Sequence, residues 1–148
     1  MRIGFVVLAT VVLAGCASIL QGSPAPTPQS FPGIAGELTT RGIVIGKYQS
    51  GDDGCHDSTL TPTAIGFDAS GLGVTTPIHL RIYIFGSGAS YDRRRPDVDT
   101  CVTAWATDPS TVEFVEARPF VLAGQGPWPD AFKAAIREAL TAAAGVGD

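Results

Sequence analysis

The sequence predicts an α+β fold, a two-layer sandwich in which a four- to five-stranded, mainly antiparallel sheet carries two helices on one face. Three observations lead to this prediction. The 148 residues suffice for one ordinary domain and are too few for two. Short segments with alternating apolar residues are separated by turns rich in Gly and Asp, which is typical of antiparallel strands. Two later segments change to the helical period, which gives the order β-β-β-α-β-α.

Three strands are predicted in the first half of the domain, over residues 41–49, 61–68 and 77–85. The turns at residues 51–54 and 70–73 contain the Gly and Asp residues that allow a chain to reverse. The third strand alternates most clearly, which indicates a sheet with one buried face. One side of this strand carries Ile78, Leu80, Ile82 and Ile84, and the other carries His79, Arg81, Tyr83 and Phe85.

A helix is predicted next, ending at Asp108-Pro109. Pro96 is expected in its first turn, where a missing N–H is tolerated. A separate short turn over residues 89–94 is expected to precede it. The residues that share one helical face are Val98, Cys101, Val102 and Trp105.

One more strand and a final helix complete the predicted domain. The strand covers residues 111–117, and residues 120–122 extend or flank it. The helix has Pro129 in its first turn and runs through an Ala-rich segment to Ala144. Its apolar side chains recur at i+4 spacing, at Trp128, Phe132, Ile136 and Leu140.

The N-terminus has the plan of a secretory signal. Arg2 supplies a positive charge and residues 3–13 carry no charge. Eleven residues of helix rise about 16 Å, roughly half of a hydrocarbon core, so a membrane-spanning anchor is disfavoured. The segment Leu13-Ala14-Gly15-Cys16 follows directly and resembles the lipobox of bacterial lipoproteins.

This resemblance covers the signal alone and implies that residues 1–15 are a removable signal peptide. It also implies that the Cys16 thiol carries diacylglycerol, with palmitate-type acylation, and becomes the new N-terminus. Two or more acyl chains hold a protein durably on a bilayer without crossing it. An ordinary secretory signal with a chance cysteine is the alternative.

A tether is predicted over residues 16–36, which contain four prolines and no charge before Glu37. Such a segment favours extended conformations and cannot bury a core of its own. The folded domain is therefore expected to be one unit over residues 37–148.

The two cysteines that remain, Cys55 and Cys101, are an even number in a compartment that permits disulfides. A bond between them would join the loop after the first strand to the first predicted helix. Closing a loop of about 45 residues is worth roughly 4 kcal/mol. Two free thiols, or a redox or metal role, are the alternatives.

Acidic residues crowd around His56, with Asp53 and Asp57 among them, and the other histidine is His79. These four residues are weak candidates for a metal site, because zinc needs three or four ligands and the calcium-loop pattern is absent. A solvated turn beside a disulfide is the simpler interpretation. No Gly-x-Ser-x-Gly motif is present, so no catalytic residue is assigned and no cofactor is expected.

Two further features are candidates for binding. The run Arg93, Arg94 and Arg95 could contact lipid headgroups, a cell-wall polymer or an acidic partner, or it could be a solvated segment neutralised by nearby aspartates. Trp128 lies between two prolines and could cap a binding groove, or it could pack under its own loop.

The net charge of −4 argues against nucleic acid as a partner, because binding phosphates needs a basic surface. The first functional hypothesis is a membrane-anchored envelope lipoprotein, lipid-held on the extracytoplasmic face, whose domain binds or interacts without catalysis. Its partners would be the membrane and an envelope protein or cell-wall ligand. The alternative is an envelope hydrolase or metal-binding protein that uses His56 with nearby carboxylates.

Overall fold

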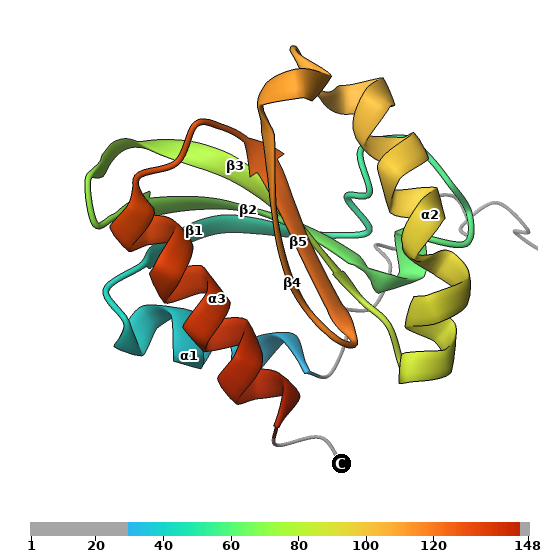
Figure 1. Ribbon diagram of the computed structural model, residues 1–148, viewed down its shortest axis with the longest axis horizontal. Helices are drawn as coiled ribbons and strands as arrows, with labels where there is room; N and C mark the ends of the chain where they lie inside the picture. The colour runs from blue at the N-terminus through green and yellow to red at the C-terminus, as the bar shows by residue number, and fades with distance from the viewer. Residues whose placement is uncertain (1–29, 146–148) are drawn as a thin grey trace, which may run out of the picture.

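An open antiparallel sheet of five strands organises residues 30–145, which are the residues that the computed structural model describes (Figure 1). The predicted signal peptide and its lipidation site Cys16 lie outside these residues. The strand order is β1-β2-β3-β5-β4, and all neighbouring strands are antiparallel. The elements are α1 (Phe31–Thr40), β1 (Val44–Ser50), β2 (Ala64–Gly71), β3 (Val74–Ile84), α2 (Gly88–Trp105), β4 (Val112–Ala117), β5 (Phe120–Gln125) and α3 (Asp130–Ala144).

Helices α1 and α3 pack side by side on one face of the sheet (Figure 1). Every strand but the exposed edge strand β1 contributes fully buried apolar side chains to this face, among them Phe67, Leu80 and Leu122. The predicted i+4 row of the last helix is confirmed here, since Phe132, Ile136 and Leu140 are all buried in the same cluster. This face therefore forms the main hydrophobic core.

Helix α2 lies against the opposite face (Figure 1). Its Val98 and Val102 form a second apolar cluster with Tyr83 of β3 and with Phe85 just after it, and these two residues alternate with Ile82 and Ile84 of the main core. The prediction that the two helices, now α2 and α3, share one face of the sheet is therefore wrong, because α2 packs on the face opposite to α3. Aromatic side chains on the presumed solvent side of the strand require a cover of their own.

Helix α2 is also longer than predicted. It begins at Gly88, and the side chain of the N-cap residue Ser87 accepts a hydrogen bond from the backbone N–H of Ser90. The separate turn expected over residues 89–94 is therefore the first part of this helix, and Pro96 lies inside it rather than in its first turn. Nothing within residues 30–145 combines the length and apolarity that a membrane-spanning helix needs.

Helix α1 falls in a segment predicted to contain the end of the tether and the start of the domain. Phe31, Ile34 and Leu38 recur on one side of this helix and are buried in the main core. Proline at the helix start is compatible with this structure, because the N–H groups of the first turn have no partner in the helix. Phe31 therefore already belongs to the folded unit that was predicted from Glu37, and residues 30–145 contain three α-helices.

Four strands, β1 to β4, agree with the predicted ones to within a few residues. The segment before β2, residues 61–63, is a short 3-10 helix rather than strand. The segment 120–122, left open as an extension or a flank, belongs to β5, which forms a hairpin with β4 and inserts between β4 and β3. The observed order is α-β-β-β-α-β-β-α.

Candidate ligand-binding site

The face of the sheet that carries α2 changes character along β3. Tyr83 is buried in the α2 cluster. Two and four residues earlier on the same face, β3 carries Arg81 and His79, and Asp68 of β2 lies opposite His79. We call this polar end of the face, with Asp68, His79 and Arg81, the open half of the sheet. These polar side chains lie beyond the buried apolar cluster that α2 forms with Tyr83 and Phe85.

Asp52 reaches the open half from the loop between β1 and β2. A Cβ atom at position 66 would lie 2.1 Å from Oδ2 of Asp52. The carboxylate can therefore rest against strand β2 only because residue 66 is glycine. The Asp52 side chain is 16% exposed in this position.

Four titratable side chains form a hydrogen-bonded row across the open half, which we call the ionic row. Oδ1 of Asp68 lies 3.0 Å from Nδ1 of His79. Nε2 of His79 lies 2.8 Å from Oδ2 of Asp52, and Nε of Arg81 donates to Oδ1 of Asp52 at 2.9 Å. Acidic and basic side chains thus alternate along the row.

Both ring nitrogens of His79 are occupied in the ionic row. A carboxylate only accepts hydrogen bonds, so both nitrogens donate to Asp68 and Asp52 when the ring carries two protons. In either tautomer of the neutral ring, one nitrogen would be an acceptor that faces another acceptor. The two carboxylates therefore occupy both ring nitrogens and leave neither free to take a proton from a substrate.

Asp52 is the best-connected carboxylate of the row. Burial by itself raises the pKa of Asp52. The hydrogen bonds from His79 and Arg81, together with their charges, lower it by more, so the pKa lies below its ordinary value of 3.8. The carboxylate is consequently ionised at neutral pH and holds the two basic side chains in place.

Arg81 is fixed from a second direction by Trp105 at the end of α2. Its guanidinium carbon lies 4.9 Å from the centroid of the Trp105 ring, in cation–π contact. Gly54, with a φ of +80°, makes room for both side chains, since a Cβ atom there would lie 2.4 Å from Cδ1 of Trp105 and 2.7 Å from Nε of Arg81. The Nε side of the guanidinium faces Asp52, and its terminal nitrogens make no hydrogen bond with the residues that the structure describes.

A cleft of about 420 Å³ lies beside this guanidinium. Arg81, Trp105 and the exposed Pro127 are among the residues that line it. Gln125 also lines it, but its carboxamide oxygen already accepts from the backbone N–H of Thr107 at 3.0 Å. Arg81 thus brings to this cleft a guanidinium whose terminal nitrogens are not used in hydrogen bonds among the described residues, and the exposed Thr107 adds a hydroxyl to the lining.

The loop that carries Asp52 is held down by its neighbour Asp53, which is 2% exposed. Oδ1 of Asp53 accepts from the backbone N–H groups of Cys55 and His56 at 3.1 and 2.8 Å, and Oδ2 accepts from the Thr61 hydroxyl at 2.7 Å. The backbone carbonyl of Asp53 accepts from the Tyr83 hydroxyl at 2.8 Å. Asp53 is therefore a structural residue that closes the loop.

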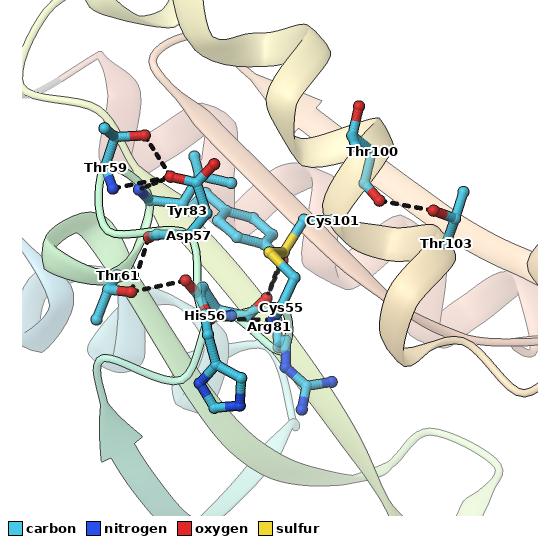
Figure 2. Close-up of a disulfide and its surroundings, with 12 residues drawn as sticks. Cys55, His56, Asp57, Thr59, Thr61, Arg81, Tyr83, Thr100, Cys101 and Thr103 are labelled. Carbon is cyan, nitrogen blue, oxygen red and sulfur yellow. Dashed lines mark hydrogen bonds between the residues drawn. A yellow bond between two sulfur atoms is a disulfide. The ribbon is translucent and has the colours of Figure 1, made fainter.

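The Cys55–Cys101 disulfide joins the same loop to α2, with an S–S distance of 1.98 Å and a Cα–Cα distance of 5.2 Å (Figure 2). The Tyr83 hydroxyl lies 3.8 Å from Sγ of Cys101. Burial in this region raises the pKa of Tyr83 to about 12, although the neighbouring Trp105 and Arg81 oppose the shift. Loop, helix and strand thus meet at the disulfide, next to the open half.

The structure does not bring the two histidines together. His56 is exposed, and its ring points away from the disulfide in Figure 2. His79 instead belongs to the ionic row. The carboxylate of Asp57 accepts from the backbone N–H groups of Thr59 and Leu60, at 2.8 and 3.2 Å. This carboxylate serves the fold of its own loop.

Within residues 30–145, one group of three potential metal ligands has donor atoms within 4.8 Å of one another. It consists of Asp53, Cys55 and Cys101. The two sulfur atoms are bonded to each other and are not thiolates, and the Asp53 carboxylate is already hydrogen-bonded on both oxygens. This group is accounted for as a structural junction.

The arginine run lies on α2 and is largely neutralised. Arg94 pairs with Asp97 at 2.5 Å, and Arg95 pairs with Glu116 of β4 at 2.5 Å. Arg93 is exposed and its guanidinium donates to the Ser90 hydroxyl at 3.3 Å. These three residues therefore do not form a continuous basic surface.

Trp128 lies in the main core instead of capping a groove. It is 6% exposed, and its ring packs edge-on against Phe132 with centroids 5.9 Å apart. Its indole N–H donates to the carbonyl of Gln125 at 3.0 Å. The packing of this residue under its own loop is the alternative that the sequence left open.

No local pattern in the sequence predicted a role in binding for Asp52, Arg81 or Trp105. The signal that could have pointed to them is indirect. His79 and Arg81 alternate with apolar residues on a strand, and an acidic loop precedes that strand. The pairing of Asp52 with Gly66, or of Trp105 with Gly54, depends on contacts between distant segments and has no local signature.

Comparison with known protein families, curated proteins and solved structures finds no match for this chain. The chemistry of the site therefore rests on its own geometry.

Proposed function

We propose that this chain is a lipid-anchored lipoprotein of the cell envelope whose domain, on the extracytoplasmic side, binds a ligand in the cleft beside Arg81 without converting it. The membrane part of this proposal rests on the lipobox-like segment that ends at Cys16. The binding part rests on a cleft with one pre-oriented cationic donor.

The engagement of His79 is the observation that favours binding over catalysis. A general base needs a free nitrogen within reach of the proton that it removes. Both nitrogens of His79 lie within 3.0 Å of carboxylate oxygens. Arg81 beside it stays protonated in proteins and is suited to holding an anion rather than to moving a proton.

The alternative, an envelope hydrolase or metal-binding protein that uses His56, has less support in the geometry. The His56 ring is exposed, and the nearby carboxylates of Asp53 and Asp57 are occupied by hydrogen bonds within the loop. If a metal ion stabilised the wild-type protein but not His56→Ala, that result would support this alternative.

Membrane fractionation tests the anchor. The Cys16→Ser variant is expected to leave the membrane fraction or to remain unprocessed, because the thioether cannot form on serine. Metabolic labelling with a fatty acid should label the wild type and not the variant. Unchanged labelling of Cys16→Ser would contradict the lipoprotein assignment.

Recovery of bound molecules from solubilised envelopes tests the binding role. The full-length wild type and Arg93→Gln, which removes an arginine outside the cleft, are expected to retain the same molecule. Arg81→Gln is expected to lose it, because Arg81 supplies the guanidinium donors in the cleft. Equal recovery on Arg81→Gln would place binding elsewhere, and chemical conversion of the molecule by the wild type would contradict a purely binding role.

A further inference from the structure

The cleft has three properties that restrict its ligand: a fixed guanidinium, a local charge close to zero, and apolar walls. Arg81 supplies the first. Its side chain is 16% exposed, its Nε is bound to Asp52, and its plane is supported by Trp105. A guanidinium held in this way loses little freedom when its terminal N–H groups bind a planar anion in a forked pair.

The ionic row sets the charge that a ligand meets. Asp52 and Asp68 contribute two negative charges, and Arg81 and a protonated His79 contribute two positive charges, so the sum is zero. With a neutral His79 the sum is −1. An anion with a single charge can still be held by the fork, whereas a phosphate dianion would face stronger repulsion from the two aspartates.

The walls add an apolar requirement. Trp105 is half-buried and Pro127 is exposed, and both line the cleft with Arg81. A ligand that places a small apolar group against these rings would gain from burial as well as from the fork. A bare inorganic anion would use only the fork.

From these three properties we infer that the cleft is a binding site for a carboxylate carried on a small apolar group, such as the C-terminal carboxylate of a peptide. The inference rests on the proposed binding function and names its ligand class. Both oxygens of the carboxylate accept from the terminal nitrogens of Arg81, and the adjoining side chain lies against Trp105 and Pro127.

Titration of the full-length protein with N-acetyl-alanyl-alanine tests the inference. The binding should shift the indole N–H resonance of Trp105, and the C-terminal amide of the same dipeptide should bind about tenfold more weakly or worse, because it lacks the charged acceptor. Inorganic phosphate should compete poorly. Equal binding of the acid and the amide, stronger competition by phosphate, or no binding of the acid would each overturn the carboxylate assignment.

Variants identify the donor. Arg81→Gln is expected to weaken binding of the acid by about tenfold or more, and Arg93→Gln, with the same charge change outside the cleft, is expected to leave it unchanged. Arg81→Lys keeps the charge and loses the fork, so it should bind more weakly than the wild type. It serves as the decisive variant if Arg81→Gln does not fold. Wild-type affinity in a folded Arg81→Lys would contradict the forked contact.

The configuration of the terminal alanine separates two sources of the same chemistry. Peptides of bacterial cell walls end in D-residues, and proteins end in L-residues, so each form of the dipeptide is titrated separately. Preference for one form names the source within the carboxylate class. If neither form binds but envelope molecules are still recovered by the wild type and not by Arg81→Gln, the carboxylate inference fails while the proposed binding function stands.

Discussion

The two faces of the sheet are built from the same strands but are covered differently. On the face beneath α1 and α3, the side chains of β3 are Leu80, Ile82 and Ile84, and all are buried. On the other face, α2 covers Tyr83 but leaves Arg81 and His79 in the open half. The difference shows that the two faces have different roles. The closed face supplies most of the hydrophobic stabilisation, and the open half holds polar groups that a full cover would have excluded.

The closed face should be the most sensitive to truncation. Phe132→Ala removes a fully buried ring that packs against Trp128, and it is expected to lower the free energy of unfolding by about 3–5 kcal/mol, because a cavity remains. Urea denaturation measures this change. Val44→Ala, at a side chain that is 64% exposed, is the control and should change stability by less than about 0.5 kcal/mol. A small effect of Phe132→Ala would contradict the statement that the closed face supplies most of the hydrophobic stabilisation.

Loss of the disulfide at the junction between the two regions should have the next largest effect on stability. Replacing both Cys55 and Cys101 by alanine is expected to cost about 2–4 kcal/mol, because the bond restricts a loop of 46 residues in the unfolded chain. Non-reducing mass spectrometry of the wild type should find the two cysteine peptides linked. Free thiols at both positions would remove this contribution and the link between the Asp52 loop and α2.

A substitution in the open half should cost the least stability of the three, but its cost should depend most clearly on pH. The pKa of Asp52 is lowered in the folded protein, so its stabilising contribution is complete above the unfolded pKa near 3.8 and is lost as the pH falls through the lower folded value. Asp52→Asn is expected to cost about 1–2 kcal/mol at neutral pH, and this gap should shrink at about pH 3. Urea denaturation of both proteins at the two pH values measures it. A gap that does not change with pH would show that Asp52 is not held as an ion by His79 and Arg81.

The strands were largely predictable because their signal is local. Alternation in residues 77–85 identified β3 and the two sets of side chains on its faces. Helix α1 was missed because the prolines before it suggested a tether, although Phe31, Ile34 and Leu38 have helical spacing. The cover over Tyr83 and Phe85 was missed because alternation tells which side chains share a face but not which helix packs on it.

The candidate site was predictable only in fragments. The sequence offered His79 as a weak metal-site candidate with His56, and the structure places His56 at an exposed position away from the ionic row. The companions that the structure supplies, Asp52 and Arg81, come from a loop and from the same strand. Arg93 and Trp128 were candidates for binding because of their residue types, but neither lines the cleft.

The sequence by itself determined the strands, the amphipathic last helix and the lipobox-like segment at Cys16, because each depends on neighbours within a few residues. It also indicated that Cys55 and Cys101 form a natural pair. Only the tertiary structure decided that Asp52 packs against Gly66 and bonds to His79 and Arg81. The same holds for the contact between Trp105, at the end of α2, and the guanidinium of Arg81. These contacts join segments that are distant in the chain, and they depend on how the loop and α2 pack against the sheet.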